Sequence, residues 1–455
     1  MIKTINPSTE EQIQSYALHD EQEVEKILDD LQGAQLALQN LNVDERARIL
    51  KNIAQALRNQ KEDFAKQMVL EMGKPLAQAQ GEIEKCAWVC EHYASAGVDL
   101  LADQIIATEG QRSYIRFEPI GVVLAIMPWN FPFWQVFRCL APHIMLGNTV
   151  ALKHAPNTTG CAVLIQDLLQ KLVPDVSLLK FLCLENNDVA KVIASKKIAA
   201  VSLTGSVRAG KSVAAVAGDN LKKTVLELGG SDPYIVLEDA DLNQAVKTCV
   251  MARFNNTGQT CVAAKRFLVH QKIYKDFEEA FVEEIKTWKQ GDPFNTQNKL
   301  GPLAREDLLQ NLERQVSRAK QESALRCLLG GKRLPGQGYF FEPTVFSGVT
   351  AGSVLSQEEV FGPVASLFKV QSEEEAIALA NDSPFGLGGA VFTKEQRGEE
   401  IAKQINAGVV AVNDMVKSDP RLPFGGVKES GYGCELGSFG FYEFANIKTV
   451  TVKSC

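Results

Sequence analysis

One cysteine of the chain lies in a setting that favours chemistry over packing. Cys261 belongs to the stretch FNNTGQTCVAAKR, in which small and polar residues precede it and a small apolar run and two cations follow it. A cysteine can be a buried small side chain, which normally has large apolar neighbours, or a reactive thiol, which needs a polar and accessible setting. The residue types around Cys261 favour the nucleophile.

A second stretch matches a phosphate-binding pattern. GSVRAGKS, Gly205 to Ser212, agrees with GxxxxGK[ST] at every fixed position and stands between a predicted strand and a predicted helix. The match raises a nucleotide triphosphatase as a hypothesis. The pattern is short, however, and a glycine-rich turn before a helix suits any anionic ligand, including the pyrophosphate of a dinucleotide.

The other cysteines give no sign of a metal site. Cys86, Cys90 and His92 stand close together, but one face of a helix accounts for their spacing. The chain has 10 cysteines and no CxxC pair, so we expect reduced thiols and no metal. None of the five histidines lies in a motif for a hydrolytic triad, with the partial exception of His154.

The elements that must position these residues follow an α/β pattern. Residues 1–97 are predicted to be helical, and residues 113–130 to be extended and to end at a turn. From residue 148, short strands alternate with helices up to KKTVLELGG, and a second alternating series begins near residue 233. Such alternation predicts parallel sheets with crossover helices.

Four polar or small residues stand at the ends of predicted strands. Asn130, Lys153, Gly205 and Glu227 lie at or just beyond such ends. Ligands of open parallel sheets bind outside the carboxyl ends of the strands, so these residues are expected at one binding edge. Cys261 lies between the two series, where a cleft between domains is expected.

The bulk composition excludes several classes of function. The chain has 455 residues, of which 45% are hydrophobic and 23% charged, as in a folded protein of two or three domains. The net charge of −7 argues against nucleic acid as a partner. No apolar run approaches the ~18 residues of a membrane span, and the N-terminus has no apolar signal core, so a cytoplasmic protein is expected.

Six motifs are spread over nearly the whole chain: PWNFP (128–132), SLTGS (202–206), LELGG (226–230), NTGQTC (256–261), EEVFGPV (358–364) and PFGGVKESGYG (423–433). Together they resemble the aldehyde dehydrogenase superfamily, in that family's order and spacing. The resemblance implies a Rossmann-like cofactor domain, an α/β catalytic domain and a small β-rich oligomerisation element.

The resemblance assigns catalytic roles to three residues. Cys261 would add to an aldehyde and give a thiohemiacetal, whose hydride passes to a nicotinamide and leaves a thioester. The side-chain amide of Asn130 and the backbone N–H of Cys261 would stabilise the oxyanion. Glu227 would be the general base for hydrolysis, and partial burial would raise its pKa towards working pH. A turn residue and a buried ion pair are the alternative roles of Asn130 and Glu227.

The resemblance also implies NAD or NADP as the cofactor. Trp129 and Lys153 would face the adenosine ribose, Gly205 and Ser206 the phosphates and nicotinamide, Leu228 the nicotinamide through its backbone, and Glu359 and Phe361 the nicotinamide ribose.

One cofactor position departs from the pattern of many NAD-specific relatives. They carry a glutamate three residues after the lysine, where it binds the ribose 2′-hydroxyl and repels a 2′-phosphate. This chain has Pro156 there, and Arg208 could pair with a phosphate. We therefore expect either cofactor to be used.

The substrate side is closest to the succinate-semialdehyde dehydrogenases of the superfamily. They carry an arginine at the position of Arg138, where a guanidinium can grip a distal carboxylate, and Ser418 resembles a carboxylate-contacting serine. Trp134 would line the tunnel. Two positions depart from some relatives. Asn255 stands where they have a second arginine, so the carboxylate is expected to be held less tightly. Ala263 stands where they have a second cysteine proposed as a redox switch, so that switch is expected to be missing.

The sequence thus predicts oxidation of a small semialdehyde by a homodimer or homotetramer. We assign 1–97 and 120–229 to the NAD(P)-binding domain, 230–435 to the catalytic domain, and 98–119 and 440–455 to the oligomerisation element, whose tail alternates like an edge strand. The alternatives are a dehydrogenase of apolar or other aldehydes, a CoA-acylating relative, a nucleotide triphosphatase and a catalytically inactive structural protein.

Overall fold

A six-stranded sheet forms the centre of the first half of the chain in the computed structural model, which describes residues 1–453. Five of its strands are parallel, and the two-residue strand β19 pairs antiparallel with one edge. In spatial order the strands are β19 (Gly431–Tyr432), β9 (Lys223–Glu227), β8 (Ile198–Thr204), β5 (Val122–Met127), β6 (Thr149–His154) and β7 (Leu179–Phe181). The parallel sheet that the first alternating series predicts is confirmed.

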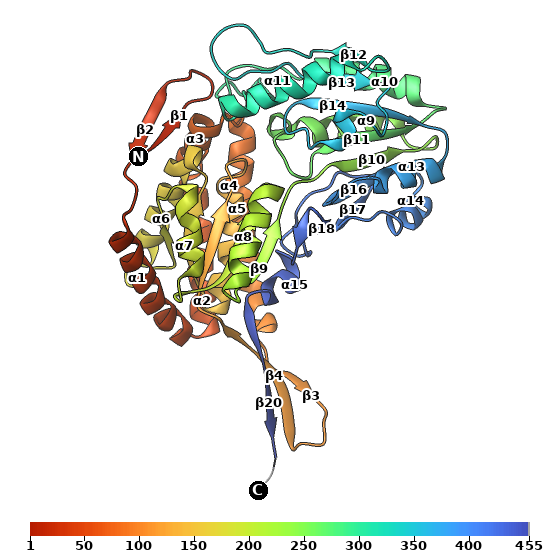
Figure 1. Ribbon diagram of the computed structural model, residues 1–455. Coiled ribbons are helices and arrows are strands. Elements are labelled where there is room, and N and C mark those ends of the chain that lie inside the picture. The colour runs from red at the N-terminus through yellow and green to blue at the C-terminus, as the bar shows by residue number, and fades with distance from the viewer. Residues whose placement is uncertain (454–455) are drawn as a thin grey trace.

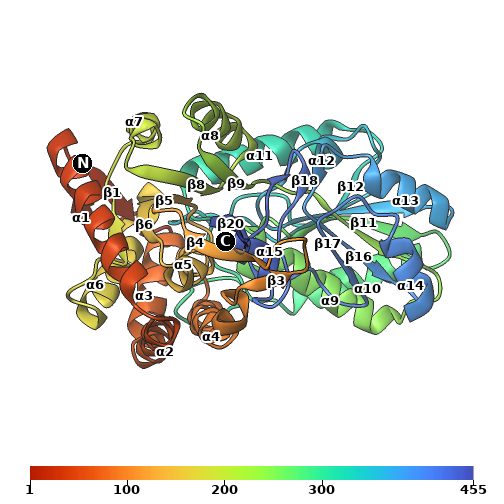
Figure 2. The same cartoon turned by 90° about the horizontal axis from the view of Figure 1, so that it is seen from below.

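Helices cover both faces of this sheet, as Figure 2 shows in end view. Two separate apolar cores fill the space between the helices and the strands. One face carries α1 (Glu21–Asn40), α7 (Val189–Ala194) and α8 (Val207–Asp219), and the other carries α2 (Val43–Asn59), α3 (Lys61–Met72), α4 (Leu76–Leu100), α5 (Trp134–Leu146) and α6 (Thr159–Leu172).

The beginnings of the first helices are set by local side chains. Asp20 and Glu23 form a capping box at α1, and Asn42 and Glu45 form another at α2. Each box satisfies two backbone N–H groups at the helix end, which stabilises the start of the helix.

A second, seven-stranded sheet forms the other half (Figure 1). Helices again cover both faces, α9 (Leu242–Phe254) and α10 (Tyr274–Lys286) on one, and α11 (Glu306–Gln321), α12 (Val354–Gln357), α13 (Glu373–Asn381) and α14 (Glu395–Ala402) on the other. In spatial order the strands are β12 (Arg326–Leu329), β13 (Thr344–Ser347), β14 (Val364–Val370), β11 (Ala264–His270), β10 (Asp232–Val236), β16 (Gly388–Phe392) and β17 (Val409–Val412).

The expectation that residues 1–97 are helical is wrong for the first 16 residues. They form an antiparallel hairpin of β1 (Ile2–Ile5) and β2 (Gln12–Tyr16). Distant contacts support this short hairpin, because the carbonyl of Pro7 accepts a 2.9 Å hydrogen bond from the backbone N–H of Tyr339. Two isolated strands are marginally stable. Because this hairpin depends on contacts with residues far along the chain, the local sequence pattern does not predict it.

A long arm projects from the first half (Figure 1). It is a three-stranded antiparallel sheet in the order β20 (Ala445–Val452), β4 (Arg112–Pro119) and β3 (Gln104–Ile106). The tail predicted to be an edge strand is β20, which within residues 1–453 pairs with β4 alone. Ile105, Ile106 and Ile447 are exposed on the arm.

The strand order of the first sheet reverses between β8 and β5, which defines a switch point. β5, β6 and β7 follow one another in one direction, whereas β8 returns to the other side of β5. Crevices for ligands form at such points, beyond the carboxyl ends of the strands.

Within residues 1–453, no helix combines the length and the apolar character that crossing a membrane requires.

Candidate active site

The loop that carries Cys261 is an unusual connection between α9 and β11. After α9, the short helix η3 (Asn255–Gly258) contains left-handed backbone at Asn256 and Thr257, with φ of 53° and 56°. Gly258 is also left-handed, and a Cβ placed on it would lie 2.3 Å from the carbonyl oxygen of Gly362. Such backbone is rare for residues other than glycine, so tertiary contacts must hold the loop.

Hydrogen bonds attach this loop to the turn that follows β5. Asn256 Nδ2 donates to the carbonyl oxygens of Asn130 (2.8 Å) and Gln259 (3.2 Å). Asn130 Nδ2 donates to the same carbonyl of Gln259 at 3.0 Å. The amide of Asn130 is therefore buried beside the cysteine loop and bonded to it.

A buried lysine fixes the backbone on the other side of the cysteine. Lys265 Nζ donates to the carbonyl oxygens of Thr260 at 3.1 Å and Cys261 at 2.7 Å. Burial raises the pKa of the Cys261 thiol to about 11, and the positive charges of Arg138 and Lys265 offset part of that rise. The resting cysteine is therefore a protonated thiol, and a base must take its proton before it attacks.

Glu227 belongs to a buried charged cluster at the carboxyl end of β9. Arg138 lies between two acids: its Nη2 is 3.9 Å from Glu227 Oε2, and its Nε pairs with Glu435. Ser202 donates to Glu435 at 3.2 Å, and Arg138 also donates to Thr204 at 3.1 Å. Burial raises the pKa of Glu227 well above its usual value, the nearby Glu435 raises it further, and Arg138 opposes the rise.

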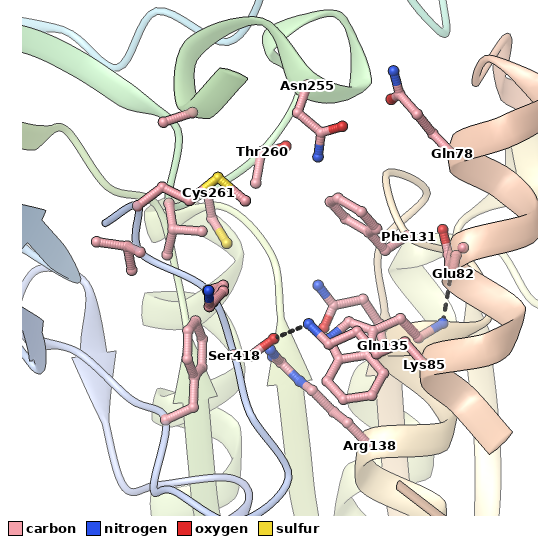
Figure 3. A pocket seen from close by; sticks show the side chains of 18 residues that line it. Gln78, Glu82, Lys85, Phe131, Gln135, Arg138, Asn255, Thr260, Cys261 and Ser418 are labelled. Carbon is pink, nitrogen blue, oxygen red and sulfur yellow. Dashed lines mark hydrogen bonds between the residues drawn. The ribbon is translucent and has the colours of Figure 1, made fainter. Parts of the chain in front are cut away.

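A cavity of about 250 Å³ opens between the two halves of the molecule. Figure 3 shows Cys261 on one side and Lys85, Ser418 and Arg138 grouped on the other. Of the predicted site residues, it is lined by Cys261, Arg138, Trp134 and Ser418, and Asn255 stands at the position where a second arginine is missing. The cavity is smaller than the ~300–1,000 Å³ of sites for drug-sized ligands, so it suits a small substrate.

The phosphate-loop pattern forms a tight turn. β8 ends at Thr204 and α8 begins at Val207, so only Gly205 and Ser206 connect them, and Ser206 caps the helix by accepting from the N–H of Ala209. Lys211 lies within α8, where its side chain is exposed and pairs with Glu429. A two-residue turn cannot wrap a triphosphate, but an anion can approach the helix N-terminus.

The other predicted cofactor residues surround the switch point, outside the lining of the cavity. Lys153 at the end of β6 donates to Asn186 at 2.6 Å, and the short helix η1 (Pro156–Thr158) follows. Trp129 packs edge-on against Phe361 at 5.7 Å between ring centroids.

Leu228 and Glu359 complete this predicted set. The backbone N–H of Leu228 donates to the carbonyl of Ser430 at 2.9 Å, and its side chain packs closely on Gly210 of α8. Glu359 accepts from the N–H of Gly230 at 3.1 Å and lies 3.5 Å from Lys265. Glu359 therefore contacts the lysine that holds the cysteine loop, whereas the contacts of Leu228 are with Ser430 and α8.

Three residues with clear structural roles escaped the sequence reasoning. Glu435 is the acid that pairs with Arg138. Glu82 accepts from the N–H groups of Phe133 and Trp134, both at 2.9 Å, and so holds the start of α5. Lys85 lines the cavity, and no local signal marks it, because it is one lysine in a long amphipathic helix.

The chain belongs to the aldehyde dehydrogenase family. The model of that family matches residues 1–450. Structures of aldehyde dehydrogenases superimpose closely: a betaine aldehyde dehydrogenase of Staphylococcus aureus in complex with NAD⁺ is 29% identical, with a TM-score of 0.94 over 99% of this chain and 91% of that chain.

Several of the relatives are named succinate-semialdehyde dehydrogenases. The chain is 43% identical to a probable succinate-semialdehyde dehydrogenase [NADP(+)] of Synechocystis over 99% of both chains. It is 44% identical to a succinate semialdehyde dehydrogenase [NAD(P)+] of Escherichia coli over 98% of this chain and 97% of the relative. A succinic semialdehyde dehydrogenase of Streptococcus pyogenes in complex with NADP⁺ is 36% identical, with a TM-score of 0.97 over the full length of both chains.

Proposed function

We propose that this aldehyde dehydrogenase oxidises succinate semialdehyde, or a similar small semialdehyde, with NAD or NADP. The observation that carries the proposal is a small cavity with the thiol of Cys261 on one side and the cationic and hydroxyl groups of Lys85, Arg138 and Ser418 on the other. An aldehyde at one end and a carboxylate at the other match these two sides. The names of the relatives from Synechocystis and Escherichia coli support the same substrate.

The first step adds the thiol to the aldehyde carbon. The sulfur–carbon bond forms as the thiol proton leaves to a base, and the carbonyl oxygen takes the electron pair of the broken π bond. Asn130 Nδ2 and the backbone N–H of Cys261 donate to this oxygen. The position of Cys261 is set by Asn256 and Lys265, whose hydrogen bonds hold the loop on both sides of it.

The second half of the reaction hydrolyses the thioester that remains after the hydride has left. Water attacks the acyl carbon, Glu227 takes a proton from that water, and the sulfur leaves with the electron pair of its bond to carbon. Glu227 Oε1 has no hydrogen-bond partner within residues 1–453, so it can accept from water. Burial raises the pKa of Glu227, so its carboxylate is a stronger base than that of an exposed glutamate.

The residues at the switch point fit a nicotinamide dinucleotide. The N-terminus of the 13-residue helix α8 offers N–H groups to a pyrophosphate, and nothing lies within 3.6 Å of a Cβ placed on Gly205, so the approach is open. The buried side chain of Asn157, next to Pro156, has no partner within the described part of the chain for either polar atom. A nicotinamide bound there would supply the hydride acceptor, and Pro156 brings no carboxylate that would repel a 2′-phosphate.

Further proposals concern the assembly and the place of the enzyme. The arm joins two or four copies, since its exposed apolar side chains and the free edge of β20 offer a surface to a second chain.

Residues 1–97 and 120–229 bind the cofactor and residues 230–435 carry the catalytic loop, although β19 of the latter range pairs with β9 of the first sheet. The cytoplasmic location is supported by the nine described cysteines, all free thiols.

A steady-state panel tests the function. Succinic semialdehyde, butanal, hexanal and benzaldehyde are each assayed with NAD and with NADP, and kcat/KM is compared. We expect succinic semialdehyde to give the highest value, and Cys261→Ser to lose activity with every aldehyde. A higher kcat/KM for the neutral aldehydes would instead identify a dehydrogenase of apolar aldehydes, which Phe131 and Phe424 in the cavity wall would accommodate.

A further inference from the structure

Lys85 differs from the other buried or half-buried cations around the cavity. Its Nζ donates to the Ser418 hydroxyl at 2.8 Å and lies 4.3 Å from the centre of the Trp134 ring. Within residues 1–453 it takes part in no salt bridge. Lys85 therefore brings a positive charge into the cavity that no carboxylate of the described chain neutralises.

The acids near Lys85 are engaged elsewhere. Glu82, one turn away on α4, pairs with Lys74 and accepts from two N–H groups at the start of α5. Asp419, next to Ser418, forms a salt bridge with Arg421. The polar partner that Lys85 has is thus a neutral hydroxyl.

Arg138, the other cation of this wall, is already neutralised. It pairs with Glu435, and Glu227 lies 3.9 Å away on its other side. A substrate carboxylate beside Arg138 would be the third acidic group around one guanidinium, and it would compete with Glu435 for that charge. Lys85 offers a full charge without a competing acid.

We propose that Lys85, with the Ser418 hydroxyl, is the group that selects substrates with a carboxylate at the end remote from the aldehyde. The inference rests on the proposed function and assigns its specificity to a particular cation. The carboxylate would accept from Lys85 Nζ and from Ser418 Oγ, on the side of the cavity away from Cys261 (Figure 3). Trp134 holds the lysine stem and head in place by its ring face.

The electrostatics of the free site agree with this role. The pKa of Lys85 is lowered to about 8, chiefly by burial and also by the charge of Arg138, whereas Cys86, Glu82 and Asp419 oppose the fall. A half-buried ammonium group without a counterion is costly to desolvate, and a bound carboxylate supplies that counterion.

The first experiment compares two aldehydes that differ in the carboxylate. The ratio of kcat/KM for succinic semialdehyde to kcat/KM for butanal is measured in the wild type and in variants. Lys85→Met keeps the apolar stem and removes the charge, and we expect the ratio to fall about 30-fold or more through a higher KM for the semialdehyde. Ser418→Ala should lower the ratio several-fold, because it removes one neutral donor, and Lys85→Arg should restore most of it.

A surface variant controls for the loss of one positive charge. Lys66→Met removes an exposed lysine of α3 and should leave the ratio at its wild-type value. If Lys85→Met also leaves the ratio unchanged, or lowers both kcat/KM values equally, Lys85 is a structural residue and the inference is wrong. The wild-type ratio itself tests the proposed function, so the two failures are distinguishable.

The second experiment measures the same ratio of kcat/KM values as a function of pH. If Lys85 were only a structural residue, its loss of charge would not change that ratio. Lys85 is charged below about pH 8 and neutral above it. The wild-type ratio should therefore fall about tenfold per pH unit above pH 8, whereas the Lys85→Arg ratio should stay level because a guanidinium keeps its charge. A wild-type ratio that stays level from pH 7 to 10 overturns the inference.

Discussion

The proposed chemistry centres on two residues, Cys261, which is half-buried, and Glu227, which is buried. Burial raises the pKa of Cys261 to about 11 and that of Glu227 well above its usual range. A neutral carboxyl cannot accept a proton, so the group works as a base only as pH rises towards its raised pKa. Arg138 lowers both pKa values and thereby favours the thiolate and the carboxylate over their protonated forms.

Substitution of Glu227 should separate the two halves of the reaction. In Glu227→Gln we expect steady-state kcat to fall about 10²–10⁴-fold, because hydrolysis loses its base. If another group takes the thiol proton, the first turnover still gives one equivalent of reduced nicotinamide in a rapid burst. Stopped-flow absorbance measures the burst, with Glu84→Gln, an exposed acid of α4, as the matched control. Loss of the burst would show that Glu227 is needed before hydride transfer.

The sequence predicts candidate site residues where chemistry dictates both type and spacing, and it gives no sign of a residue such as Lys85 that contributes by its position in the fold. Cys261, Glu227 and Asn130 stand in motifs that can be recognised one residue at a time. Lys85 and Ser418 are 333 positions apart and meet only because α4 and the loop after β17 face one cavity. Which cation of that wall remains free of acids depends on packing, and no pattern in the chain reveals it.

At the scale of elements, the cysteine loop depends on one glycine in particular. Gly258 has φ of +73°, and a Cβ there would lie 2.3 Å from the Gly362 carbonyl oxygen. We expect Gly258→Ala to cost about 1–2 kcal/mol for the left-handed backbone alone. Relief of the clash would move Cys261, and a shift of ~1 Å can cost ~10²-fold in rate. Thermal unfolding and kcat measure the two effects.

A second glycine serves as the control for this prediction. Gly33 lies inside α1, and nothing is within 4 Å of a Cβ placed on it. Gly33→Ala should raise stability by about 1 kcal/mol, since alanine is the better helix former, and should leave kcat unchanged. A Gly258→Ala variant with wild-type kcat would show that the loop is not under the tight steric control described above.

The sequence predicts most elements because their periodicity extends over whole strands and helices. The strands and helices of both alternating series are where the pattern places them. The two-residue strands β15 (Phe385–Gly386), β18 (Val427–Lys428) and β19 are too short to leave a pattern, and they exist through pairing with segments far along the chain. The hairpin β1–β2 belongs to the same class.

At the scale of the whole molecule, the arm is the part that a single chain leaves without a partner. β20 pairs with β4 on one side only, and Ile105 and Ile447 are 67% and 56% exposed. Open strand edges with apolar side chains promote pairing between chains, and the arm projects away from the rest of the molecule (Figure 1). A homo-oligomer would cover these groups.

Charged substitutions on the arm should therefore break the assembly. In the double variant Ile105→Asp, Ile447→Asp we expect a lower mass by light scattering after size exclusion, towards the 49.8 kDa of one chain. Leu36→Asp, at an equally exposed position on α1, should keep the wild-type mass. The fold of one chain should survive, because both isoleucines face solvent, and thermal unfolding checks this. A double variant with the wild-type mass, or a wild type that is already monomeric, would place any oligomer contact elsewhere.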